Sequence, residues 1–280
     1  MSARSSFPQL SERAHAFFGR EHIFRDLSRS CSFERLAEEL DRLHVPWFDQ
    51  LFELEEQFGG LVRRGAHTKT PTLALGLFQL ICLGIGESDE SDTDEPDESA
   101  VVTVRWPMAR LAATGEDLVH VGLYTPEGDL YMSESGAILL YLPMLDRVDV
   151  LSGSPRTFLE RIALEDEMRR RHREYAGTYL FADIGEALAH AFGLSCVEES
   201  SDALTQHWVS DQLFVSRLPT STTSRSDART RIISENTEQL LTVVRRAREE
   251  NADVKVSVEA HLPGGRARRE ALERAGIAVA

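Results

Sequence analysis

Five short β-rich runs lie close together in the middle of this chain, and their spacing limits the fold more than any other feature. They are VVTVRW (101–106), LVHVGLY (118–124), LYM (130–132), AILLYL (137–142) and VDVL (148–151). Pro126, Gly128 and Gly136 provide turn residues between these runs. Parallel neighbours would need a long crossover connection, so strands this close in sequence are expected to pair antiparallel. The runs therefore predict an antiparallel meander.

Helical patterns lie on both sides of the meander. Apolar residues recur at helical spacing within residues 11–27, 32–43 and 48–58. After the meander, Ser154 is a good N-cap and Pro155 a good first helical residue for a helix that ends near residue 170. Helices, an antiparallel sheet and a further helix in this order predict an α+β fold.

The segment from residue 72 to residue 84, TLALGLFQLICLG, is apolar. It predicts one or two buried strands, although a helix remains an alternative, because a short apolar run does not distinguish the two. The segment joins the 48–58 helix to the meander and belongs to the same predicted sheet.

The helix over 48–58 ends in Phe58-Gly59-Gly60-Leu61. One glycine suffices to end a helix, because glycine reaches left-handed backbone angles without a Cβ clash. Two glycines between large apolar residues allow two interpretations: a flexible joint, or a packed turn in which a strand crosses close to the helix. We predict the packed turn, with Phe58 buried and a positive φ at one of the two glycines.

An acidic run, ESDESDTDEPDE, occupies residues 87–98 and has eight acidic residues and no basic one. Such a segment cannot bury enough apolar surface to offset its ordering entropy, so the sequence predicts a disordered loop there. The net charge of the whole chain is −15. A field of this sign disfavours nucleic acid and suits a basic protein partner.

The composition, with 42% hydrophobic and 28% charged residues, is that of an ordinary globular protein. The sequence contains no apolar run near the about 20 residues that span a bilayer, and its first 22 residues contain no apolar signal core. The cysteines, Cys31, Cys82 and Cys196, are odd in number and form no paired motif. These features predict free thiols and a cytoplasmic protein without a membrane partner.

Basic residues are biased toward arginine. The chain has 29 arginines and only two lysines, Lys69 and Lys255. Folding does not demand this bias, which instead suggests a GC-rich, bacterial coding genome.

The last 80 residues predict a small C-terminal β-α-β-α unit. The strand candidates are 212–218, 230–234 and 254–259. A helix follows Asn236, with Gln239 placed as in a capping box, and a last helix ends at Gly276. We expect the chain to divide into 1–200, which holds the meander, and 201–280.

Candidate catalytic or metal-binding residues are few. Glu186 and His190 stand four residues apart, which places both on one helix face, but two ligands do not make a metal site. Cys196 with His190 or His207 could form a nucleophile and base, although a small buried thiol is the commoner role of such a cysteine. We therefore predict no catalytic residue, no metal site and no cofactor.

The segment PGGRARRE, residues 263–270, is a weaker candidate. Gly264 and Gly265 precede an arginine-rich helix whose first turn could bind an anion. The spacing is not that of a P-loop, and a solvated basic helix is the favoured interpretation. The basic cluster at 169–174 suits the end of a helix, where cations interact well with the helix dipole.

Two stretches resemble the SUKH superfamily. FDQLFELEEQFGGL (48–61) is similar to the family's helix that ends in an aromatic-Gly-Gly turn leading into a sheet. The stretch 128–168 is similar to its later hairpin, connecting strand and Ser-initiated helix. The matching residues there are Leu130, Tyr131, Gly136, Ser154, Phe158, Leu159, Glu160, Arg161, Ala163 and Leu164. The resemblance covers about residues 32–170. This chain departs from compact members of the family by its acidic insertion at 87–98 and by its C-terminal unit.

The resemblance implies a protein-binding module without catalytic residues. Many bacterial SUKH-like proteins are immunity proteins that neutralise a toxin, often a nuclease, and others are interaction scaffolds. Our leading hypothesis is an immunity protein against a cognate toxin. A regulatory scaffold of the same fold is the second hypothesis, and an anion-binding or enzymatic role of the C-terminal unit is the third. The oligomeric state stays open.

Overall fold

The computed structural model describes residues 7, 9–26, 32–46, 48–64, 71–77, 102–105, 108–111, 115–124, 128–145, 147–171, 176–219 and 229–280. Its described residues form two compact units, unit 1 up to Pro155 and unit 2 from Arg156 onward. Both units combine antiparallel sheets with helices, so the protein has the α+β fold that the sequence predicts. The acidic run 87–98 lies outside the described residues.

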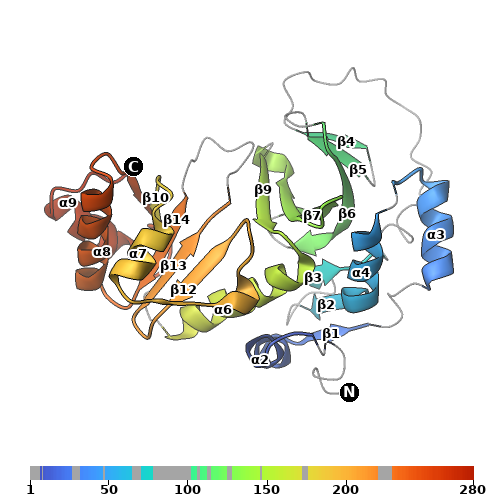
Figure 1. Ribbon diagram of the computed structural model, residues 1–280, viewed down its shortest axis with the longest axis horizontal. Coiled ribbons are helices and arrows are strands. Elements are labelled where there is room, and N and C mark those ends of the chain that lie inside the picture. Colours follow the sequence, from blue (N-terminus) through green and yellow to red (C-terminus); the bar gives the residue numbers. More distant parts are fainter. Residues whose placement is uncertain are drawn as a thin grey trace. The chain divides into compact units, whose positions relative to one another are not determined.

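Unit 1 is built on an antiparallel sheet of nine strands among its described residues (Figure 1). Seven strands follow the order β1-β2-β3-β6-β7-β8-β9, and β4 pairs with β5, which pairs with β6. The strands are β1 (Ile23–Arg25), β2 (Leu61–Arg64), β3 (Pro71–Leu75), β4 (Val102–Arg105), β5 (Met108–Leu111), β6 (Asp117–Tyr124), β7 (Gly128–Ser133), β8 (Ile138–Leu142) and β9 (Arg147–Ser152). The predicted meander is therefore confirmed, with β5 as a strand that the sequence patterns did not reveal.

The helices of unit 1 precede most of its sheet. They are α2 (Glu12–Arg20), α3 (Phe33–Arg42) and α4 (Asp49–Phe58), and a short 3-10 turn, η2 (Pro143–Leu145), joins β8 to β9. The Ser32 side chain accepts a hydrogen bond from Arg35 N and caps α3. The Ser11 side chain caps α2 in the same way, through Ala14 N.

The prediction of a helical pattern over 11–27 is wrong beyond Arg20. His22 takes a positive φ of 53°, which ends the helical path, and β1 follows at once. β1 pairs antiparallel with β2, with Ile23 opposite Arg63, so sheet pairing overrides local helix propensity there. The strand interpretation of 72–84 is correct for β3, and the part from residue 78 lies outside the described residues.

Among its described residues, unit 2 contains a six-stranded sheet of order β11-β12-β13-β14-β10-β15. Its strands are β10 (Thr178–Leu180), β11 (Ser195–Cys196), β12 (Gln206–Val209), β13 (Leu213–Arg217), β14 (Thr230–Ser234) and β15 (Val256–Val258). Its helices are α6 (Pro155–Arg171), α7 (Gly185–Ala191), α8 (Thr237–Glu250) and α9 (Gly265–Arg274), and η3 (Glu198–Ser200) is a 3-10 turn. The predicted strands and helices of the C-terminal region are confirmed.

The expected boundary near residue 200 does not match this division, which falls near residue 155. β10 lies between β14 and β15 inside the second sheet, although it precedes residue 200 in sequence. The β-α-β-α unit predicted for 201–280 is thus part of a larger sheet. Local patterns did not reveal this, because three-residue strands carry little periodicity.

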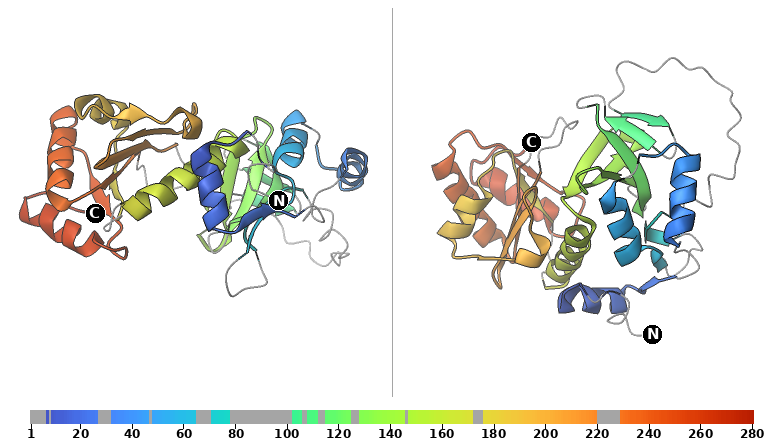
Figure 2. Two further views of the ribbon diagram at one scale, coloured as in Figure 1. Left: turned by 90° about the horizontal axis from the view of Figure 1, so that it is seen from below. Right: turned by 45° about the vertical axis from the view of Figure 1, so that its right-hand side comes forward.

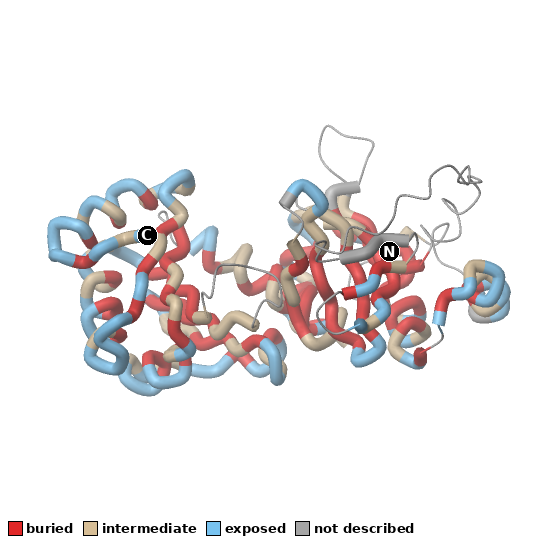
Figure 3. The backbone as a smooth tube through the Cα atoms, turned by 90° about the horizontal axis from the view of Figure 1, so that it is seen from above, coloured by how far each residue is buried: buried red, intermediate tan, exposed pale blue. Residues whose placement is uncertain are grey.

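Helices lie on both faces of the second sheet (Figures 1 and 2). Each face has an apolar core. On one face α7, α8 and α9 cover a large apolar cluster that includes Leu180, Val215, Ile232, Val244 and Leu272. On the other face α6 contributes Leu164 and Met168 to a smaller cluster with Val197, Phe214 and Ile233. Buried residues, red in Figure 3, follow the strands of both units. None of the described helices combines the length and the hydrophobicity needed to cross a membrane.

Candidate functional site

The Phe58-Gly59-Gly60-Leu61 segment is a packed turn, as predicted. Phe58 is 1% exposed and its ring stacks on Phe7, with the ring centroids 6.3 Å apart. Gly60 has a φ of 75°, in the left-handed region that favours glycine. Leu61 begins β2 and is fully buried. The turn therefore joins helix to sheet inside the core of unit 1.

Gly59 makes room for a buried carboxylate. A Cβ added to Gly59 would lie 2.4 Å from both the carbonyl oxygen and the Oε1 atom of Glu55. Glu55 is 5% exposed, and its Oε2 atom accepts a hydrogen bond of 2.8 Å from Leu77 N. The two glycines thus have different tasks: Gly59 gives space to Glu55, and Gly60 supplies the backbone angle.

Arg25 completes the turn from β1. Its Nε atom donates to the carbonyl of Gly59 at 2.8 Å, and its Nη2 atom donates to the carbonyls of Glu55 and Glu56 at 3.1 and 3.0 Å. The last carbonyls of a helix lack intrahelical partners, and a cation there interacts well with the helix dipole. Arg25 therefore caps α4, and the segment has a structural role.

The candidate metal and nucleophile residues do not converge. Glu186 and His190 lie on α7 as predicted, and both are exposed. Cys196 is exposed, with its Sγ atom 3.8 Å from Ser201 Oγ, whereas the ring of the buried His207 bonds to Ser216. Within the described residues, no group of three or more His, Cys, Asp or Glu side chains is arranged to hold a metal ion.

The two glycines at the start of α9, its N-cap Gly264 and its first residue Gly265, serve packing. Gly264 has a φ of 82°, and a Cβ on Gly265 would lie 2.1 Å from the carbonyl oxygen of Glu259. Arg268 is fully buried, and its Nη1 and Nη2 atoms donate to the carbonyls of Ala176 and Ser234 at 2.9 and 2.6 Å. This arginine ties α9 to the sheet, so the geometry favours the structural interpretation of PGGRARRE.

The basic residues that end α6 are paired along their own helix. Arg169, Arg170 and Arg171 form ion pairs with Glu165, Asp166 and Glu167, each four residues earlier. This pattern is typical of a self-neutralised helix surface.

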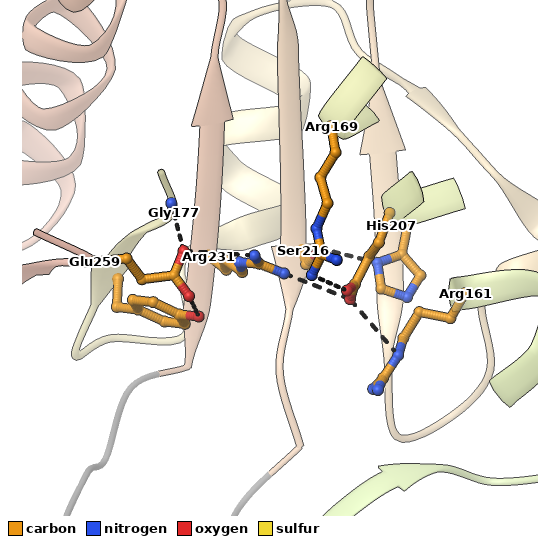
Figure 4. Close-up of polar contacts among 9 residues, drawn as sticks. Arg161, Arg169, Gly177, His207, Ser216, Arg231 and Glu259 are labelled. Carbon is orange, nitrogen blue, oxygen red and sulfur yellow. Dashed lines mark hydrogen bonds and ion pairs between the residues drawn. The ribbon is translucent and has the colours of Figure 1, made fainter. Parts of the chain in front are cut away.

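The main assembly of ionisable residues lies between α6 and the second sheet (Figure 4). We call it the α6 cluster; it comprises Arg161, Glu165, Arg169, Tyr179, His207, Ser216, Arg231 and Glu259. All eight residues belong to unit 2. Three come from successive turns of α6, and the rest come from β10, β12, β13, β14 and the residue after β15.

Arg231 is at the centre of the cluster and links its two carboxylates. Its Nη1 atom lies 3.4 Å from Glu165 Oε1, and its Nη2 atom lies 3.6 Å from Glu259 Oε2. Glu259 also accepts hydrogen bonds from Gly177 N at 2.6 Å and from the Tyr179 hydroxyl at 2.8 Å. The Arg231 guanidinium lies over the Tyr179 ring, 5.8 Å from its centroid. These contacts connect α6 with β10, β14 and the residue that follows β15.

Burial and neighbouring charges together set the pKa values of Glu165, Arg231 and Tyr179 in the cluster. Burial raises the pKa of the Glu165 carboxyl, but Arg231, Arg161 and Arg169 outweigh burial and hold that pKa below its usual value. Burial lowers the pKa of Arg231, and the attraction of Glu165, Tyr179 and Glu259 reverses this, so its pKa is raised. Burial, opposed by Arg231 and reinforced by Glu259, raises the pKa of Tyr179. The Glu165–Arg231 pair therefore stays ionised at neutral pH.

His207 and Ser216 form the nearest approach to a catalytic pair. His207 Nδ1 lies 2.9 Å from Ser216 Oγ, and the two residues are 1% and 2% exposed. Burial, together with the charge of Arg161, lowers the pKa of His207 to about 3, so the ring is neutral. In a hydrolytic triad the second ring nitrogen bonds to a carboxylate. His207 Nε2 has no hydrogen-bond partner among the described residues. Buried in this way, the pair is suited to anchoring β12 to β13.

The α6 cluster is not among the sites that the sequence predicts. Arg231 lies beside two isoleucines in the strand candidate TRIIS, and Glu165 stands four residues from both Arg161 and Arg169. A charged residue inside a predicted strand was the available signal, but it did not identify its partners Glu165 and Glu259, which lie 66 and 28 positions away in the sequence.

Comparisons with known proteins do not assign the chain to a family. No protein-family model matches it, and neither the curated proteins nor the solved structures include a significant match.

Proposed function

We propose that this chain is a non-catalytic protein-binding module of the SUKH type, and that it acts as a cytoplasmic immunity protein against a cognate toxin. The proposal starts from the resemblance of residues 48–61 and 128–168 to that superfamily. Its main support is the turn at 58–61: Phe58 is buried, Gly60 has a positive φ, and the chain passes directly from α4 into β2. The resemblance implies a helix that ends in an aromatic-Gly-Gly turn and leads directly into a sheet.

The ionisable residues of unit 2 also favour binding over catalysis. The charges of the α6 cluster compensate one another, and His207 is neutral and buried. A general base needs a pKa near the working pH and reach to a substrate. His207 has neither property, so the cluster is better suited to holding α6 on its sheet.

The net charge indicates the kind of partner. A chain with a charge of −15 attracts a basic protein, and nucleases that bind nucleic acid are often basic. Charge complementarity speeds encounter, so we expect faster association at low salt, since ions screen charges beyond about 10 Å at 0.1 M.

The experiment is a titration of a candidate toxin with this protein. A pull-down from the native host identifies the partner, and the product of the adjacent gene is the first candidate. An immunity protein should abolish toxin activity at a fixed molar ratio and copurify with the toxin. Inactivation of excess toxin by trace amounts of the protein would instead indicate enzymatic detoxification and overturn the proposal.

Matched variants sharpen this experiment. Glu186→Gln, His190→Gln and Cys196→Ser alter exposed side chains that do not converge, so the combined variant should protect as well as the parent. Loss of protection by this variant in a folded state would point to an enzymatic site. Binding without any effect on toxicity would favour the regulatory scaffold.

A further inference from the structure

A pocket of about 310 Å³ lies at the end of α8 in unit 2 and has no role in the proposed function. Its walls are the last turn of α8, the loop that follows, the start of β15 and the segment around Val279. Val279 joins the sheet by a parallel bridge to Val256. The volume is at the lower end of the range for small-molecule sites, so it suits a compact ligand.

Local structure fixes the rim of this pocket. α8 ends at Glu250, and Asn251 leaves the helix in an extended conformation. The Asn251 side chain accepts a hydrogen bond from Asp253 N at 3.2 Å, and its carbonyl accepts one from Val254 N at 3.2 Å. This turn holds the loop in place within the chain itself, so the pocket is preformed.

The floor of the pocket is apolar and its rim is cationic. Val254 and Val256 line it and are 4% and 1% exposed, because they belong to the core shared with α8. Arg248 and Lys255 line the rim, together with Asp253. Lys255 is one of only two lysines in a chain with 29 arginines.

The two cations are not neutralised within the described residues. Neither side chain makes an ion pair or hydrogen bond there, and the Arg248 Nε atom is shielded from solvent without a partner. Elsewhere on α8, Arg246 pairs with Glu249 and Glu250. A buried guanidinium N–H without a partner is costly, and a ligand oxygen would satisfy it.

From these observations we propose that the pocket binds a small organic monocarboxylate with a short apolar body. Arg248 and Lys255 receive the carboxylate, and the valine floor takes the apolar part. Two cationic side chains line the pocket against the Asp253 carboxylate, and the terminal carboxylate of Ala280, which also lines it, accepts a hydrogen bond of 3.1 Å from Arg269. Three cations against two carboxylates leave one positive charge, which favours a monoanion. The proposal does not depend on the protein being an immunity protein.

Benzoate is a suitable probe, because it joins one carboxylate to a compact apolar ring. In a titration of ¹⁵N-labelled protein at constant ionic strength, we expect saturable shifts of the amides of residues 252–256, 278 and 279. Benzamide, the uncharged analogue, should bind at least about tenfold more weakly. Equal shifts with benzamide, or no saturable shift with benzoate, would overturn the proposal.

Arg248→Gln and Lys255→Gln should each weaken benzoate binding by about tenfold. Arg245→Gln is the matched control, since Arg245 is exposed on the same helix but does not line the pocket. Equal weakening by the control would indicate a diffuse charge effect and contradict the assignment. If Arg248→Gln does not fold, Lys255→Gln decides the question. Inorganic phosphate binding as tightly as benzoate would show an adventitious anion patch only and would also overturn it.

Discussion

In unit 1 the buried carboxylate of Glu55 lies against backbone groups, whereas in unit 2 the carboxylates of Glu165 and Glu259 face arginine side chains. Glu55 accepts from Leu77 N and fits because Gly59 has no Cβ. Glu165, on α6, and Glu259, just after β15, depend on Arg231 of β14. The first arrangement is tied to a short glycine motif. The second exists only when α6 and the sheet come together.

This difference predicts different weaknesses. The turn of unit 1 is sensitive to shape, because added atoms meet backbone at short distances. The α6 cluster is sensitive to charge, because removal of one partner leaves another buried charge uncompensated. Substitutions that alter only shape or only charge test the comparison.

The largest expected loss of stability comes from removing a buried ring in the turn of unit 1. Phe58→Ala removes a ring that is 1% exposed and should lower the free energy of unfolding by about 3–5 kcal/mol. Urea unfolding curves measure this loss. Phe24→Ala is the control, since Phe24 is 39% exposed and should cost about 1 kcal/mol or less. Equal losses would show that the turn is not a packed element.

The next largest loss of stability is expected when the charge of Arg231 is removed from the α6 cluster in unit 2. Arg231→Met keeps much of the side-chain volume but leaves Glu165 and Glu259 without their shared partner, and should cost about 3 kcal/mol. Hydrogen exchange of the β14 amides reports this loss within unit 2. Arg217→Met breaks the more exposed pair with Asp183 and should cost less than about 1 kcal/mol. A similar cost for both would mean that the cluster is no more than a surface network.

A smaller effect separates backbone angle from packing. Gly60→Ala places a Cβ at a φ of 75° and should cost about 1–2 kcal/mol. Gly19→Ala is the matched control, because an added Cβ there meets no atom within 4 Å and alanine favours the helix. Thermal unfolding should therefore show a loss for Gly60→Ala and no loss for Gly19→Ala. The absence of a loss at Gly60 would remove the conformational role of this glycine.

The last effect is a pH dependence confined to unit 2, measured as a slope per pH unit. The pKa of His207 falls from 6.5 to about 3 on folding. Between these values the unfolded chain binds the proton and the folded protein does not, so stability falls as the pH falls. The slope contributed by His207 is at most about 1.4 kcal/mol per pH unit. His207→Gln should reduce the slope measured by urea unfolding at several pH values, and an unchanged slope in this variant would contradict the prediction.

Sequence reasoning anticipated the parts of the fold that depend on short-range chemistry. The Asn236 side chain caps α8 through Gln239 N, and Gly276 follows α9 with a φ of 76°. The turn residues around the meander marked β6 to β8 in the same way. It failed at β1, where pairing with β2 overrides a helical pattern, and at β10, whose three residues lie between β14 and β15. The partner strands, β2 for β1 and β14 and β15 for β10, are all distant in sequence.

By itself, the sequence determined the α+β class, the caps, the antiparallel meander and the glycine turn, because each follows from residues within a few positions of one another. Only the tertiary structure decided that Arg25 caps α4, that Arg231 joins Glu165 to Glu259, and that Arg248 and Lys255 border one pocket. The physical reason is that buried charge needs partners in three dimensions. The chain supplies them from different strands and helices, at separations that no local pattern records.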